Sequence, residues 1–162
     1  MKSKRWETAI LLMVGLTISY MMRVNVSMAV TVLADDLGWS DTEKGVLLSS
    51  FFWGYAIGQV PWSIMTLSFS PSFLYGVGVI IPSVLTILFP MVCSYSFHGA
   101  VYMQLFNGLA SGALFPSLFR FFPAWIPFNE RPFIVSLITS GIYIVSLCAC
   151  IIYCFVISLH LM

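Results

Sequence analysis

The stretch GVLLSSFFWGYAIGQVP, residues 45–61, decides the fold, because it is long, almost wholly apolar and free of charge. Small residues recur in it at every fourth position: Ser50, Gly54 and Gly58. Positions four apart share one face of a helix, so these residues form a strip that a neighbouring backbone can approach closely. The sequence therefore predicts a membrane helix that packs tightly against another helix.

The composition indicates the class of protein. Hydrophobic residues make up 60% of the 162 residues and charged residues 8%, and the mean hydropathy is +0.99. Such a chain cannot present a water-soluble surface, so we expect an integral membrane protein in contact with the lipid bilayer. The net charge of +1 gives no reason to expect a nucleic-acid partner.

Short polar turns divide the chain into apolar runs. The runs predict an all-α membrane protein with about five transmembrane helices, at residues 8–34, 45–67, 73–93, 100–122 and 133–159. The first run is roughly 40 Å long as a helix, enough to cross a bilayer with tilt. A cleavable signal peptide is the alternative for this run, but the run is longer than a signal core and contains Arg23.

Prolines and glycines mark the third and fourth predicted helices. Pro82 and Pro90 predict kinks in the third helix. Gly108 and Gly112 repeat the small-residue spacing in the fourth helix. Two helices with this spacing favour a compact bundle.

Basic residues favour one orientation in the membrane. With a cytoplasmic N-terminus, only Lys44 lies outside. The basic residues that then lie inside are Lys2, Lys4, Arg5, Arg120 and Arg131. Because positively charged loops remain in the cytoplasm, we expect a multi-pass protein with a cytoplasmic N-terminus.

Four segments carry a resemblance to a known family: YMMRVNVSMAV (20–30), LGWSDTEKGVLLSSFFWGYAIGQVP (37–61), FNGLASGALFPSL (106–118) and WIPFNER (125–131). Together they resemble the first half of the organic anion and sodium/phosphate cotransporters of the major facilitator superfamily, which include sialin and the vesicular glutamate and nucleotide transporters. The resemblance implies twelve helices in two halves, with an anionic substrate bound at the midplane between them. The five predicted helices correspond to part of the first half-bundle.

Arg23 is the one full charge deep in a predicted helix, where an unpaired charge costs on the order of 3 kcal/mol or more. The resemblance associates the arginine of RVNVS with binding or coupling an anion, so Arg23 is the best single candidate. The alternative is that Arg23 reaches water near the outer end of the helix, with Asp35 or Asp36 as a partner.

Three aromatic residues, Tyr20, Phe51 and Tyr55, are candidates to line an anion pathway, since phenols donate hydrogen bonds to anions. Packing or lipid contact is the alternative for them.

Gln104, Asn107 and Ser111 share one face of the fourth predicted helix. That face is expected to line the cavity or to form hydrogen bonds between helices. The family usually has an arginine at the position of Gln104 and often a carboxylate at that of Ser111.

The connecting loops differ in how far they follow the family. The stretch LSFSPSF, residues 67–73, lacks the aspartate and the basic residues of the family's gate latch. Glu130 and Arg131 retain the pattern of the fourth connecting loop, and they are expected to form a gate-loop ion pair. A simple topological anchor is the alternative for this pair.

The sequence contains no enzyme signature, so we expect neither an enzyme nor a cofactor. Cys148, Cys150 and Cys154 lie close together, but without a nearby histidine or carboxylate they favour packing over a metal site.

Two functions remain. The first is an alternating-access transporter, or a fragment of one, that couples an organic or inorganic anion to sodium or proton movement. Since a second half-bundle and a sixth helix are not in the sequence, this function would need a partner half-bundle. The second is a truncated, non-transporting multi-pass protein that acts as an interaction partner or is an incomplete product.

Overall fold

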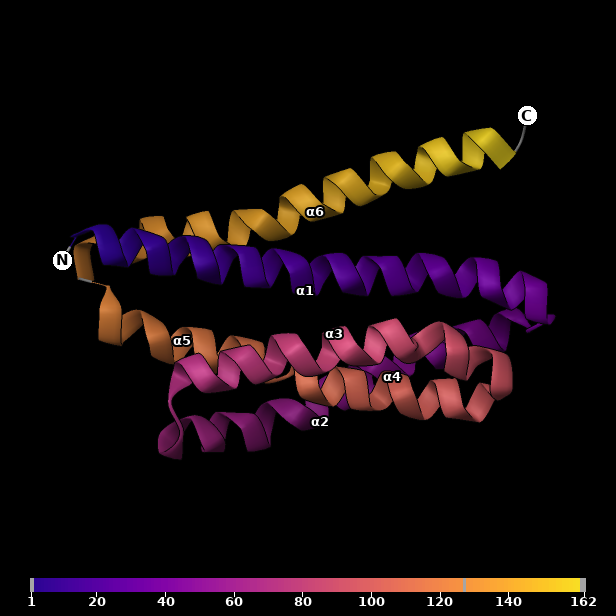
Figure 1. Cartoon of the computed structure of the whole chain (residues 1–162), viewed down its shortest axis with the longest axis horizontal. Helices are drawn as coiled ribbons and strands as arrows, with labels where there is room; N and C mark the ends of the chain where they lie inside the picture. The colour runs from indigo at the N-terminus through magenta and orange to yellow at the C-terminus, as the bar shows by residue number, and fades with distance from the viewer. Residues whose placement is uncertain (1, 127, 161–162) are drawn as a thin grey trace.

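The computed structural model describes residues 2–126 and 128–160, and the described residues are nearly all helical (Figure 1). The elements in chain order are α1 (Lys2–Leu37), α2 (Asp41–Ser68), α3 (Pro71–Tyr95), α4 (Phe97–Ser111), α5 (Leu114–Trp125), a 3-10 turn at Phe128–Glu130, and α6 (Arg131–His160). The prediction of an all-α protein is confirmed.

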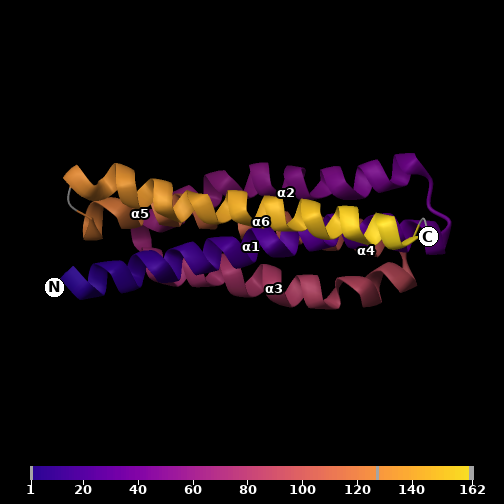
Figure 2. The same cartoon turned by 90° about the horizontal axis from the view of Figure 1, so that it is seen from above.

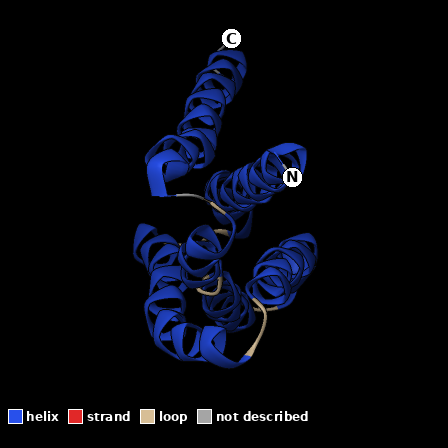
Figure 3. Cartoon of the chain, turned by 90° about the vertical axis from the view of Figure 1, so that its left-hand side faces the viewer, coloured by secondary structure: helices blue, strands red, loops and turns tan. Residues whose placement is uncertain are grey.

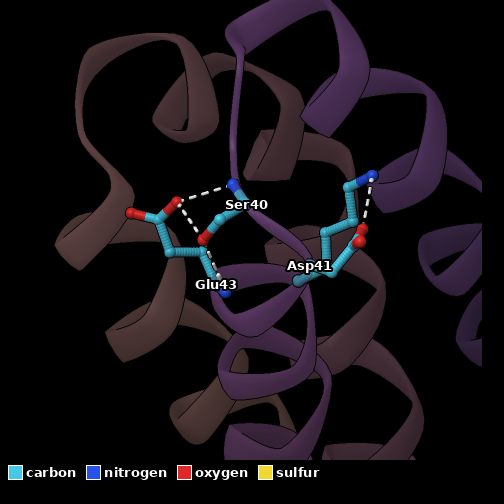
Figure 4. Close-up of polar contacts among 4 residues, drawn as sticks. Ser40, Asp41 and Glu43 are labelled. Carbon is cyan, nitrogen blue, oxygen red and sulfur yellow. Dashed lines mark hydrogen bonds and ion pairs between the residues drawn. The ribbon is translucent and has the colours of Figure 1, made fainter.

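The turn between α1 and α2 sets where α2 begins. Gly38 has a φ of 69°, a conformation that favours glycine. The Ser40 hydroxyl accepts a hydrogen bond from the Glu43 backbone N–H at 3.3 Å, and the Glu43 carboxylate accepts one from the Ser40 N–H at 2.8 Å (Figure 4). This capping box supplies partners for N–H groups at the helix start, so α2 begins at Asp41, ahead of the apolar run that starts at residue 45.

The fourth predicted helix, residues 100–122, is divided in the structure into α4 and α5. Pro116 is the physical reason: it lacks the N–H that would bond to the carbonyl of Gly112, and its ring crowds that carbonyl. Tighter hydrogen bonding is found at the break, where the Ala113 N–H donates to the Ala110 carbonyl at 3.2 Å. By contrast, α3 continues as a helix through Pro82 and Pro90. α4 and α5 follow one another along the bundle (Figure 1), and Figure 2 shows that the long helices run lengthwise beside one another.

The helices carry the apolar surface expected of membrane spans. Residues Trp6–Ala34 of α1 and Pro71–Tyr95 of α3 are long and apolar enough to cross a membrane, judged by length and composition. Large apolar side chains point outward: Trp53 is 68% exposed and Ile87 is 75% exposed. Such a surface suits lipid rather than water.

Two side-chain clusters hold the helices together at opposite ends. Leu16, Leu118 and Ile138 belong to the cluster that joins α1, α5 and α6 near the N-terminus. Val30 and Leu47 belong to the cluster that joins α1 and α2 to α3 and α4 at the other end. The N-terminal part of α6 lies beside α1, and its C-terminal part points away from α1 and the other helices (Figures 1 and 3).

Candidate functional site

The tight contact between α2 and α4 positions one wall of the site. A methyl group added to Gly54 would overlap the carbonyl oxygen of Leu105, and one added to Gly58 would lie 2.6 Å from the carbonyl oxygen of Leu109. The two helices therefore touch backbone to backbone along the predicted small-residue strip. This contact fixes α2 and α4 next to each other at the cavity described next.

A cavity of about 490 Å³ lies between α1, α2, α3 and α4. Most of its wall surface is apolar, although half of the lining residues have polar side chains, and these come from α1, α3 and α4. The lining residues are Ser19, Met22, Arg23, Val24, Val26, Ser27 and Met28 with Thr31 from α1, Leu48, Phe51 and Phe52 from α2, Pro82 and Thr86 from α3, and Gln104, Asn107 and Ser111 from α4. A mostly apolar pocket with a few polar groups is typical of small-molecule sites.

Aromatic rings surround the guanidinium of Arg23 at the cavity wall. Its Cζ atom lies 4.5 Å from the ring centre of Phe51, 4.9 Å from that of Tyr20 and 5.3 Å from that of Tyr55. Each of these distances falls within the range of a cation–π interaction. The rings stabilise the charge, yet they provide no acceptor for its N–H groups apart from the phenol oxygens. Among the described contacts, Arg23 has no hydrogen bond and no ion pair with a carboxylate.

An amide cluster forms a second polar part of the cavity. The Asn107 Nδ2 atom donates to the Gln104 Oε1 atom and to the Thr86 Oγ1 atom, each at 3.4 Å. Gln104 is 3% exposed and Asn107 is 6% exposed. The hydroxyl of Ser111 belongs to the same face of α4 and is also buried. Buried amides hold their polar atoms at defined positions, so the cluster presents a fixed set of hydrogen-bonding groups.

The structure thus brings the predicted site residues together. Arg23, Phe51, Gln104, Asn107 and Ser111 line the cavity. The aromatic residues Tyr20 and Tyr55 contact Arg23. The bond from Asn107 to Thr86 also joins α4 to α3, so the predicted alternative of bonding between helices holds beside the cavity role. The side chains of Asp35 and Asp36, the alternative partners of Arg23, lie outside the described residues.

The loop residue Arg131 is placed differently from the prediction. Its Nε atom donates to the carbonyl of Ile126 at 3.0 Å and its Nη2 atom to that of Pro123 at 3.4 Å, while Phe128 lies beneath it at 5.7 Å. The described contacts of Arg131 therefore go to the carbonyls at the C-terminal end of α5, which lack partners in the helix, rather than to Glu130. Pro127 and the side chain of Trp125 lie outside the described residues.

Two residues at the site were missed from the sequence. Thr86 accepts the bond from Asn107. Trp62 donates its indole N–H to the carbonyl of Leu109 at 2.7 Å, just before the break between α4 and α5. A signal for Trp62 was present, because it continues the spacing of four that runs through Gly54 and Gly58.

The described side chains contain no group of three or more His, Cys, Asp or Glu residues that could hold a metal ion. Cys93 is buried and Cys148 is exposed. The side chains of Cys150 and Cys154 lie outside the described residues.

Comparison with known proteins identifies relatives for nearly the whole chain. The family model described as Major Facilitator Superfamily matches residues 12–159. A probable anion transporter, chloroplastic, of Oryza sativa subsp. japonica is 31% identical over 87% of this chain and 24% of its own length. A chloroplastic sodium-dependent phosphate transport protein of Arabidopsis thaliana is 30% identical over 87% and 28%. A potential vesicular glutamate transporter of Caenorhabditis elegans is 30% identical over 87% and 29%. The chain spans about a quarter of the length of these relatives.

Proposed function

The chain belongs to the Major Facilitator Superfamily, and on that premise we propose that its cavity forms part of a transport pathway for an organic or inorganic anion. Membership of this family makes the chain an integral, multi-pass membrane protein. Arg23 is the residue that attracts the anion. Tyr20, Phe51 and Tyr55 hold its guanidinium in place, and the amide face of α4 lines the same cavity.

The observation that carries this proposal is the environment of the Arg23 guanidinium. It lies on a cavity wall among aromatic rings, and its described contacts include no carboxylate to neutralise it. The N–H groups of a guanidinium lie in its plane and match the two oxygens of a carboxylate or phosphate. A charged side chain within a membrane helix costs free energy, and such a charge is usually found where it binds a ligand or an ion. The names of the relatives, which include anion, phosphate and glutamate transporters, support the same class of ligand.

The transport cycle completes the proposal. A second half-bundle faces the cavity, and rocking of the two halves exposes the anion to each side of the membrane in turn. Movement of sodium ions or protons drives the cycle. The distribution of basic residues, with only Lys44 on the opposite side, supports a cytoplasmic N-terminus.

Substitution of Arg23 tests the proposal at two levels. Binding of phosphate and glutamate to the chain in lipid nanodiscs is measured first, and uptake of the same labelled anions into proteoliposomes second. We expect Arg23→Gln to weaken binding about tenfold or more, because a charge-assisted hydrogen bond is lost, and Arg23→Lys to weaken it less. Arg120→Gln, at an exposed arginine outside this cavity, is the matched control.

Undiminished binding by Arg23→Gln would remove Arg23 from the site. If the parent chain bound none of these anions, the alternative of a non-transporting membrane protein that acts through a partner would take precedence.

A further inference from the structure

The cavity is lined by one charged residue and by several neutral polar residues, and this distribution of charge restricts which ligands it can bind. Arg23 is the only charged residue among the described residues that line it. The other polar residues of its lining are neutral: the amide cluster of Gln104 and Asn107 with Thr86, and the hydroxyl residues Ser19, Ser27, Thr31 and Ser111. A multiply charged anion would leave charge without a partner among these neutral groups, which is costly.

The amide cluster has hydrogen-bonding capacity left over. Asn107 uses its Nδ2 atom for both described bonds, so its Oδ1 atom and the Nε2 atom of Gln104 have no partner among the described residues. If both amides were turned over, one donor and one acceptor would still remain. Both residues line the cavity, and no fully buried side-chain polar atom of the described residues lacks a partner, so these two atoms are open to the cavity and a ligand can contact them. A ligand group that both donates and accepts, such as a hydroxyl, satisfies this end.

The cavity is large, and apolar side chains form much of its wall. The cavity volume of about 490 Å³ far exceeds what an inorganic anion fills. Met22, Met28 and Pro82 are among the apolar residues of its wall. Burial of apolar ligand surface against an apolar wall favours binding, whereas a small hydrated ion has no apolar surface to bury there.

We propose that the preferred ligand of this cavity is a singly charged organic anion with an apolar or aromatic body and a neutral hydroxyl group. The carboxylate binds Arg23, the body packs on the apolar wall, and the hydroxyl binds Gln104 and Asn107. This inference rests on the proposed function, because it assigns the anion to Arg23.

A set of four probes tests the proposal on the full chain in lipid nanodiscs at neutral pH. The probes are inorganic phosphate, acetate, benzoate and 4-hydroxybenzoate, and the dissociation constant of each is measured by isothermal titration calorimetry. We expect benzoate to bind at least tenfold more tightly than acetate and phosphate. We expect 4-hydroxybenzoate to bind about fivefold more tightly than benzoate.

Gln104→Leu is the decisive variant, because leucine is of similar size and has no polar atoms. It should abolish the advantage of 4-hydroxybenzoate over benzoate, and the readout is the ratio of the two dissociation constants in the variant compared with the parent. Thr86→Val is the second variant, used if Gln104→Leu does not fold, and it should reduce the same advantage by freeing Asn107 from its described partner.

Phosphate binding as tight as that of benzoate, or an unchanged hydroxyl advantage in both variants, would overturn the inference. Failure of the proposed function gives a different result: the neutral analogue 4-hydroxybenzamide would bind as tightly as 4-hydroxybenzoate, and Arg23→Gln would change neither.

Discussion

The contact between α2 and α4 and the contact between α1 and α6 both contain glycines, but these glycines meet different kinds of atom. A methyl group on Gly54 of α2 would overlap the backbone carbonyl of Leu105 in α4. A methyl group on Gly141 of α6 would overlap the side-chain hydroxyl of Thr17 in α1. A backbone carbonyl moves only with its helix, whereas a hydroxyl turns about one bond. The α2–α4 contact is therefore the rigid side of the bundle, and the α1–α6 contact is the adjustable side.

Among these contacts, we expect the largest loss of stability from a substitution at Gly54. Gly54→Ala should destabilise the protein by about 3 kcal/mol or more, because the added methyl group forces two helices apart along their whole contact. The free energy of unfolding, measured by titrating mixed micelles with denaturing detergent, checks this prediction. Gly76→Ala in α3 is the matched control, because a methyl group there has nothing within 4 Å. Equal stability of the two variants would show that α2 and α4 can separate at little cost.

Trp62 should give the next largest effect, since it ties α2 to the end of α4. Trp62→Phe leaves the carbonyl of Leu109 without the indole N–H, so we expect a loss of about 1–2 kcal/mol in the same titration. Trp53→Phe is the control, because Trp53 is 68% exposed and points away from the bundle. If both variants lost the same stability, the bond to Leu109 would not matter to the rigid side.

Much of the α2–α4 contact could be predicted from the sequence, because small residues at a spacing of four predict a face on which two helices pack closely. Gly54 and Gly58 do meet the α4 backbone, and Gln104 and Asn107 do share a cavity face. Residues three or four positions apart lie on the same face of a helix, so this spacing alone was enough to predict that each pair shares a face.

The remaining features depend on atoms that only the folded chain brings together. Thr86 stands alone in an apolar run, and nothing in the sequence pairs it with Asn107. Arg131 was expected to pair with its neighbour Glu130, whereas its described hydrogen bonds go to the carbonyls of Pro123 and Ile126 at the end of α5. The break between α4 and α5 could have been predicted from Pro116, whose effect on a helix is local.

Gly141 should show a smaller effect than Gly54, because its clash is with a side chain. Gly141→Ala turns the Thr17 hydroxyl away from the carbonyl of Met13, to which it donates at 2.7 Å, so we expect a cost of about 1 kcal/mol. In a Thr17→Ala background the same substitution should cost almost nothing, and this double-mutant cycle is the measurement. A cost that stayed the same in that background would mean that the α1–α6 backbones are as closely fixed as those of α2 and α4.

The smallest expected effect lies at the outer end of the rigid side, where α2 begins ahead of its apolar run. The pKa of Glu43 is lowered from its ordinary value, first because the carboxylate accepts a hydrogen bond from the Ser40 backbone N–H and then because it accepts one from the Ser40 hydroxyl. A lowered pKa means that the cap contributes stability above the pKa of Glu43 in the unfolded chain. That contribution is lost as the pH falls through the lower, folded value. The amide resonance of Ser40, followed by NMR during acidification, should therefore titrate below the ordinary range of a glutamate.

Arg131 provides the contrast at the α5–α6 corner, because its described hydrogen bonds go to backbone carbonyls and involve no carboxylate. The amide resonance of Arg131 should stay constant while that of Ser40 moves, and Glu43→Gln should abolish the movement at Ser40. A Ser40 midpoint at or above the ordinary glutamate pKa would contradict the capping box. It would also remove the Glu43 contact as a difference between the start of α2 and the corner beside α1 and α6.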